Sequence, residues 1–205
     1  SLGLWVVNRA LRSGMHLRRD TCRLPTCRVV RATEVLPSRI VMHRTAEPQA
    51  LVRALTETTR RIDAAARRLP VAQLAVSAAP DGWSPNEILW HLRAVADVYG
   101  DHITRIVNED APRWRHVSPR ARMKTARYDQ LPFAESFAAF TQQRAELVSL
   151  LGSLPPEAWQ RVALVKVEHK GGQESPLTLL ERVRGMVNHE EIHCAQMEEA
   201  AAALR

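Results

Sequence analysis

Four separate segments of this 205-residue chain repeat apolar residues every three to four positions, and this pattern constrains the fold more than any other feature. The segments cover about residues 47–69, 84–110, 132–151 and 175–204. Such a repeat places the apolar side chains on one face of an α-helix and most of the charged side chains on the other. Four amphipathic helices of this length can bury their apolar faces against one another. The sequence therefore predicts an all-α fold, a four-helix bundle.

The second segment has the clearest start of the four. Residues 84–87, Ser-Pro-Asn-Glu, place serine at the N-cap, proline at the first helical position and glutamate at the third, which is a capping box. Trp83 precedes the cap and is placed to pack on Ile88. Residues 175–176, Ser-Pro, predict the start of the fourth helix in the same way.

Two connections are longer than a tight turn requires. Residues 111–131 are polar and contain a basic run from Arg120 to Arg127. Long connections inside a domain are often lids or pocket walls, so the basic run is consistent with contact to an anionic substrate and equally with a solvated loop. Residues 162–167, Val-Ala-Leu-Val-Lys-Val, are β-like, and we expect an extended arm over the bundle or a small hairpin.

Charge is concentrated at the N-terminus. Residues 1–41 hold eight arginines against Asp20 and Glu34, which leaves 21 of the 29 basic and 20 of the 22 acidic residues in the remainder. We interpret residues 1–41 as a basic N-terminal extension outside the core domain, 42–205, with Met42 close to the natural start. A transit-type peptide and a nucleic-acid-binding arm are the alternatives. The nearly neutral body argues against a nucleic-acid partner there.

The cysteines and the hydropathy bound the cellular setting. Cys22, Cys27 and Cys194 are too few for a disulfide framework, and the Cys22–Cys27 pair lacks the second pair of a zinc site. No run of eighteen apolar residues is present, so we expect no membrane-spanning helix. A cytoplasmic protein with reduced thiols fits these features best.

Three of the eight histidines fall on inward helix faces. His189 and His193 lie four residues apart on the fourth helix, about 6 Å apart along its axis. His91 lies on the apolar side of the second helix. Each one alone is more often a satisfied core histidine, but three that converge predict a metal site with open coordination positions, as in catalytic centres. Nitrogen ligands suit zinc, nickel, iron or copper better than magnesium or calcium.

Four further residues lie near these histidines in the sequence. Glu190 and Asp97 are candidates to orient the ligand imidazoles by hydrogen bonding. Cys194 follows His193 but points about 100° round the helix, so we expect core packing. His102 lies about 16 Å beyond His91 along the helix axis, so it cannot share the same ion, and we expect it at the rim or surface.

Two motifs contain the three candidate ligands. Residues 83–92, Trp-Ser-Pro-Asn-Glu-Ile-Leu-Trp-His-Leu, and residues 189–196, His-Glu-Glu-Ile-His-Cys-Ala-Gln, occur in this order. They resemble the patterns W-S-x-x-E-[IL]-[LV]-x-H-[LI] and H-[DE]-x-x-H-x-x-Q of the DinB-like superfamily, the metalloenzymes of the DinB/YfiT type. The resemblance covers about residues 47–203. The chain departs from the family in its basic extension and in Glu190, where aspartate is frequent.

The resemblance implies an up-down-down-up bundle and a divalent metal, such as zinc, nickel or iron, on His91, His189 and His193. It also implies a homodimer and a small-molecule substrate, since characterised members include transferases and isomerases that use bacillithiol, mycothiol or glutathione. We therefore expect a transferase in which a low-molecular-weight thiol, deprotonated by the metal, attacks an electrophile held by residues 111–131. Hydrolysis by metal-bound water is one alternative, and a bundle that binds a metal or a partner without turnover is the other.

Overall fold

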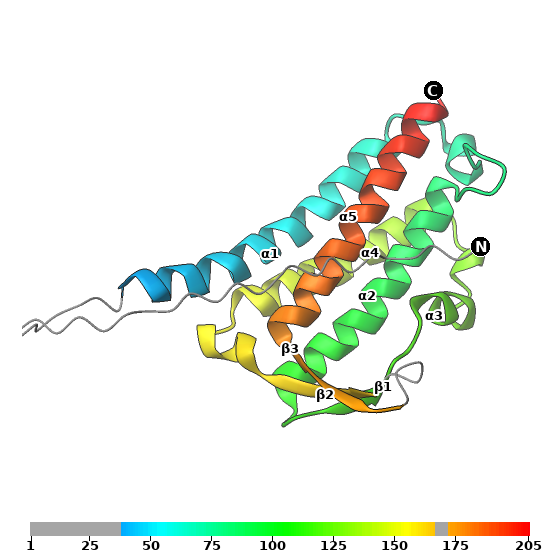
Figure 1. The fold of residues 1–205 in the computed structure, drawn as a ribbon. Coiled ribbons are helices and arrows are strands. Elements are labelled where there is room, and N and C mark those ends of the chain that lie inside the picture. The colour runs from blue at the N-terminus through cyan, green and yellow to red at the C-terminus, as the bar shows by residue number, and fades with distance from the viewer. Residues whose placement is uncertain (1–37, 167–171) are drawn as a thin grey trace, which may run out of the picture. The chain divides into compact units, whose positions relative to one another are not determined.

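A computed structural model of the protein describes residues 38–166 and 172–205. Its framework consists of four long helices, α1 (Ser38–Ala66), α2 (Pro85–Asn108), α4 (Phe133–Gly152) and α5 (Leu179–Ala203) (Figure 1). Shorter elements connect them: η1 (Val71–Ala75), β1 (Arg113–Arg115), α3 (Pro119–Thr125), η2 (Tyr128–Gln130), η3 (Pro156–Gln160), β2 (Val162–Lys166) and β3 (Glu174–Thr178).

Each long helix packs on two others, because α1 and α2 both contact α4 and α5. Helices α1 and α5 run toward the end of the bundle at which the C-terminus lies, and α2 and α4 run the opposite way (Figure 1). The predicted four-helix bundle is confirmed. The core lies between the four helices and includes Leu55, Ile62, Leu89, Leu92, Ile103, Phe140, Leu151, Met186 and Met197.

The long connection between α2 and α4 follows from their parallel directions. Helix α2 has 24 residues and is therefore about 36 Å long, so the chain has to return over that distance before α4 begins. The connection is more regular than a loop, since it contains β1, α3 and η2. Both α3 and η2 pack against α2 on the way back.

Both ends of α2 are held by specific hydrogen bonds. At the start, the Ser84 hydroxyl accepts from the Glu87 amide at 3.3 Å, and the Glu87 carboxylate accepts from the Ser84 amide at 2.8 Å. The predicted capping box is thus confirmed. At the other end, the Arg161 guanidinium donates to the carbonyls of Ile106 at 2.7 Å and Glu109 at 2.6 Å, and so satisfies acceptors that a helix end leaves free. Helix α2, which supports His91, is thus held at both ends.

The prediction for the start of α5 was wrong. The N-cap is Thr178, whose hydroxyl accepts from the Glu181 amide at 3.1 Å in a second capping box. Residues 175–176 lie in β3 instead, antiparallel to β2 with Val162 opposite Thr178. Strand β3 is an edge strand of a sheet ordered β1-β2-β3, and an edge tolerates the missing amide hydrogen of a proline. Of the two expected alternatives, an extended arm and a small hairpin, the antiparallel pairing of β2 with β3 supports the hairpin, and β1 adds a parallel strand to it.

Helix α1 also differs from its predicted bounds. It begins at Ser38, continues through Pro48 and ends at Ala66, so residues 67–69 lie in the turn that follows. The helix therefore includes residues 38–41, which the charge distribution places in the basic extension. Cys22 and Cys27 lie outside the residues that the structure describes.

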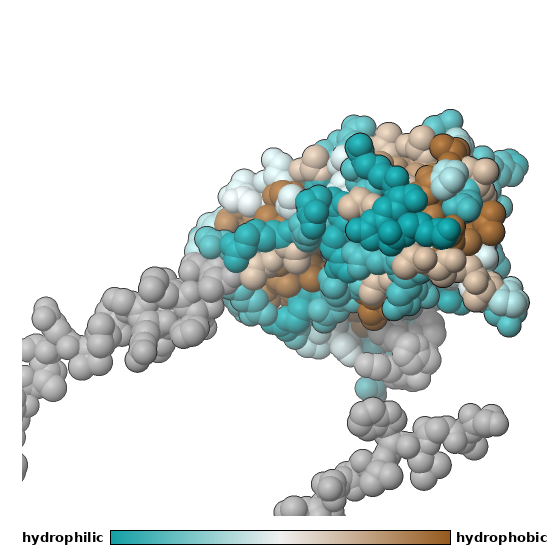
Figure 2. Space-filling model, turned by 90° about the horizontal axis from the view of Figure 1, so that it is seen from above, coloured by the Kyte–Doolittle hydropathy of each residue, from teal (hydrophilic) through white to brown (hydrophobic). Residues whose placement is uncertain are grey.

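The face of the bundle that Figure 2 shows is mostly polar. Hydrophobic residues lie on it in small patches between polar ones. Within residues 38–166 and 172–205, no helix combines the length and apolar character needed to cross a membrane.

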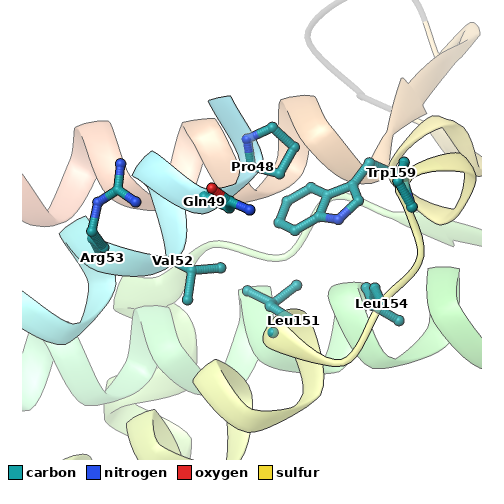
Figure 3. Close-up of a pocket in the computed structure, with 9 residues that line it drawn as sticks. Pro48, Gln49, Val52, Arg53, Leu151, Leu154 and Trp159 are labelled. Atoms are coloured by element: carbon teal, nitrogen blue, oxygen red, sulfur yellow. The ribbon is translucent and has the colours of Figure 1, made fainter. Parts of the chain in front are cut away.

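A cavity of about 310 Å³ lies between α1, the end of α4 and η3, where Pro48 and Val52 face Leu151 and Trp159 (Figure 3). Its lining is largely apolar and contains no histidine.

Candidate metal centre

The three candidate ligands come together between α2 and α5. His91 extends from α2, and His189 and His193 extend from successive turns of α5. One nitrogen from each ring lies within 4.8 Å of the other two, and the ring centroids are 4.6 to 5.1 Å apart. His91 is buried, and the other two are half-buried, so the cluster reaches the surface on one side.

The spacing of the nitrogens fits a shared metal ion. The Nε2 atoms of His91 and His189 are 3.3 Å apart. Two nitrogens bound at about 2.0–2.1 Å to one tetrahedral ion are about 3.3–3.4 Å apart, which is the same separation. Three imidazoles would leave at least one coordination position for water or substrate. The donor set therefore fits an ion such as zinc.

All three imidazoles are neutral at pH 7. Burial lowers the pKa of His91 to about 3 and that of His189 to about 4, and the nearby imidazoles add to both shifts. Burial also lowers the pKa of His193, although its hydrogen bond to Gln196 opposes the shift. A neutral imidazole keeps the lone pair that a metal requires.

Gln196 orients one of these imidazoles, a role that was not among the expectations from the sequence. The Nδ1 atom of His193 lies 2.8 Å from Oε1 of Gln196, a geometry in which Nδ1 donates and Nε2 is left for the ion. The i, i+3 spacing of the two residues on one helix was the available indication. The Nδ1 atoms of His91 and His189 have no hydrogen-bond partner in the described parts of the chain.

The expectation that Glu190 and Asp97 orient the imidazoles was wrong. Glu190 is fully buried and forms an ion pair with Arg144, which is 3% exposed, inside the bundle. Asp97 accepts hydrogen bonds from three residues of other elements: Tyr128 at 2.5 Å, Gln143 at 2.6 Å and Arg122 at 2.9 Å. Both carboxylates have other partners because neighbouring helices supply arginine and amide donors that sequence spacing does not reveal.

Trp83 and Arg120 border the three histidines, and Arg120 is the part of the basic run that helix α3 brings there. Trp83 lies against the rings of His91 and His193, with centroids 5.1 and 5.8 Å away. The guanidinium of Arg120 lies 5.2 Å from the Trp83 ring, and its charge helps to lower the pKa of His91 and of His193. The 111–131 connection thus borders the cluster, as expected, and contributes an exposed cation there.

His102 was expected at the rim or surface, and this prediction was wrong. It is 4% exposed and stacks on Trp114 of β1, with ring centroids 4.2 Å apart. The strand covers this end of α2, which a helix considered alone does not show. Burial lowers the pKa of His102 to about 3, with a further contribution from the charges of Arg182 and Arg105.

We expect His102 to make the metal-free protein sensitive to acid. Its pKa rises from about 3 to 6.5 on unfolding, so the unfolded state binds the extra proton, and stability present above pH 6.5 is lost as the pH falls toward 3. Between pH 7 and pH 5 this loss amounts to about 2 kcal/mol. Urea unfolding at both pH values should show a loss smaller by about that amount in His102→Phe, which can keep the stacking on Trp114. Equal losses in the two proteins would contradict this account.

Cys194 has the structural position that its helical angle predicted. It is 1% exposed and belongs to the hydrophobic core. Burial raises the pKa of its thiol to about 12, so the thiol stays protonated at neutral pH. It is therefore no nucleophile for the neighbouring site.

The fold and the site together define a class of protein, a helical bundle with a candidate three-histidine metal centre between two helices. The chain belongs to the DinB superfamily, whose family model matches residues 54–197. No curated protein matches the sequence significantly.

Solved structures that are similar to this fold include a bacterial four-helix bundle and a thiol-dependent isomerase. YfiT from Bacillus subtilis, described as a probable metal-dependent hydrolase with an unusual four-helix bundle topology, has 17% identity and a TM-score of 0.61, covering 77% of this chain and 87% of its own. A mycothiol-dependent maleylpyruvate isomerase has 16% identity and a TM-score of 0.56, covering 73% of this chain and 60% of its own.

Proposed function

We propose that this protein is a metal-dependent transferase that activates a low-molecular-weight thiol at His91, His189 and His193. The observation behind the proposal is the convergence of three neutral imidazoles at metal-ligand spacing. A divalent ion held there would supply the charge that deprotonates a coordinating thiol. The substrate is a small electrophile, and by the family resemblance we expect a cytoplasmic homodimer.

The hydrogen bonds of the nearby carboxylates favour thiol chemistry over hydrolysis. A metal-bound water is commonly assisted by a general base within hydrogen-bond reach. Glu87 is held by the helix cap, and Glu190 and Asp97 have the partners described above. In the described ranges, no carboxylate is among the charges that shift the pKa values of the three histidines. A thiol needs no such base, since the ion itself favours the thiolate.

The residues around the cluster would bind and shield the electrophile. Trp83 offers an aromatic wall beside His91 and His193, and Arg120 over that wall can attract an anionic or polarised group. The similar structures are consistent with either chemistry, because one is described as a probable hydrolase and the other depends on a thiol. Hydrolysis therefore remains the second candidate function.

The proposal is tested with cobalt-substituted protein and three thiols: glutathione, bacillithiol and mycothiol. We expect at least one thiol to produce a sulfur-to-cobalt charge-transfer band and to react with a haloaromatic electrophile or with fosfomycin. Both effects should vanish in His193→Ala, and the charge-transfer band should persist in His116→Ala, which alters an exposed histidine outside the metal cluster. Hydrolysis of ester or amide substrates without any thiol, with no band for any of the three, would replace the transferase by the hydrolase.

A further inference from the structure

A second cluster of polar and aromatic side chains adjoins the three-histidine site on the side toward the sheet. Its members are Tyr99 and His102 of α2, Trp114 of β1 and Arg182 of α5. The Tyr99 ring lies 6.3 Å from the ring of His189 and 6.4 Å from that of His102, which stacks on Trp114. We call these four residues the Arg182 cluster. It is continuous with the metal centre through a single ring, that of Tyr99.

Arg182 has no counter-ion in the described part of the chain. Its guanidinium lies 4.4 Å from the Tyr99 ring and is half-buried, and within residues 38–166 and 172–205 its polar partner is the Tyr99 side chain. Burial removes water from around the guanidinium and so lowers its pKa. By contrast, Arg184 on the same helix pairs with Glu47, and the buried Arg144 pairs with Glu190. A partly buried cation without a partner costs free energy that a bound anion would recover.

The cluster also contains several hydrogen-bonding nitrogens without a partner. Among the described residues, the buried Nε of Arg182, Nε1 of Trp114 and Nδ1 of His102 lack one. The arginine and indole nitrogens are always donors, and an imidazole nitrogen is a donor in one tautomer. Because buried polar groups are normally hydrogen-bonded, this concentration of free donors indicates a missing acceptor.

We propose that the Arg182 cluster binds a carboxylate group of the substrate or of the thiol whose reacting atom lies at the three-histidine site. This inference rests on the proposed function and adds a substrate class to it. The planar guanidinium can donate two parallel hydrogen bonds to a carboxylate. Only one formal positive charge is present in the cluster, since His102 is neutral, so a monoanionic carboxylate matches it better than a dianionic phosphate. Arg182, Tyr99 and Trp114 are each partly exposed, so the cluster borders solvent, although the free Nε of Arg182 and Nε1 of Trp114 are themselves buried.

The test uses the full-length, metal-free protein, so that it does not depend on the metal. Succinate is titrated while the NMR signals of the Arg182 Nε–H and the Trp114 indole N–H are followed, with the uncharged succinamide as the comparison ligand. We expect succinate to shift both signals and succinamide to bind at least about tenfold more weakly, as the loss of a charge-assisted hydrogen bond implies. Equal binding of the two ligands, or no binding of succinate, would overturn the proposal.

Two variants assign the binding to Arg182. Arg182→Gln should weaken succinate binding by about tenfold or more, and Arg184→Gln, which removes a cation from the same helix, should leave it unchanged. If Arg182→Gln does not fold, Arg182→Lys replaces it, and a several-fold weaker affinity is expected because the two parallel donors are lost. Unchanged affinity in the folded Arg182 variant would refute the assignment.

Failure of this inference and failure of the proposed function give different results. If the protein retains no metal but binds succinate through Arg182, the carboxylate subsite stands and the metal-dependent function falls. If metal and thiol bind as expected but succinate does not, the function stands and the subsite falls.

Discussion

Replacement of His91 by alanine is expected to abolish stoichiometric metal binding. The substitution removes one of three nitrogens that lie within 4.8 Å of one another and leaves only the two histidines of α5. Altering residues that merely support a metal ligand costs about 10–100-fold in affinity, so loss of a ligand should cost at least about 100-fold. Inductively coupled plasma mass spectrometry of the purified protein should find near one equivalent of a transition metal in wild type and little in the variant.

The loss of metal binding in His91→Ala should also be visible in measurements of thermal stability. An ion present at about 100 times its dissociation constant stabilises the folded state by about 2.7 kcal/mol. For a domain of this size that corresponds to a rise of about 5–10 °C in the midpoint of thermal unfolding. His91→Ala should lose this metal-dependent rise, and His116→Ala should keep it. Metal content in His91→Ala equal to that of wild type would exclude His91 as a ligand.

Among the single substitutions considered, Glu190→Ala should lower the free energy of unfolding the most. It would leave the guanidinium of Arg144 inside the bundle without its counter-ion. Breaking a buried pair in this way typically costs about 3–5 kcal/mol, because the remaining charge is neither solvated nor compensated. The free energy of unfolding, measured with urea on metal-free protein, should fall by that amount.

A double variant separates the cost of an unpaired charge from the value of the pair. Replacing Arg144 by methionine together with Glu190 by leucine removes both charges and keeps apolar volume. Because such replacements are often neutral or stabilising, the double variant should regain most of the stability lost in Glu190→Ala. A double variant as unstable as the single one would mean that packing, rather than charge, dominates at this position.

Local features of the sequence predicted the helices well and the sheet poorly. The capping box at Ser84 and the apolar repeat of α2 act within one or two turns, so they can be recognised without the rest of the chain. The start of α5 could not be recognised in this way, because a Ser-Pro pair such as residues 175–176 is compatible both with a helix cap and with an edge strand. Pairing of β3 with β2, and of β1 with β2, decided between them, and β1 lies about fifty residues from its partner.

At the candidate site, too, some features follow from local sequence and others depend on distant segments. The positions of His91, His189 and His193 on inward faces follow from helical periodicity, and two motifs link them to one family. The partners of Glu190, Asp97 and His102 did not follow from helical periodicity, because each partner belongs to another element. These partners are Arg144 of α4, Tyr128 of η2 and Trp114 of β1. Spacing along one helix indicates direction but not what lies opposite.

The sequence by itself thus determined that four amphipathic helices form a bundle and that three histidines face its interior, because hydrophobic periodicity and capping are local. Only the tertiary structure decided that the histidine nitrogens lie at metal-ligand spacing and that Gln196 orients one of them. It also decided that Arg182 is half-buried beside Tyr99 without a counter-ion among the described residues. Burial and pairing depend on how distant segments pack, and the free energy of a charge depends on both.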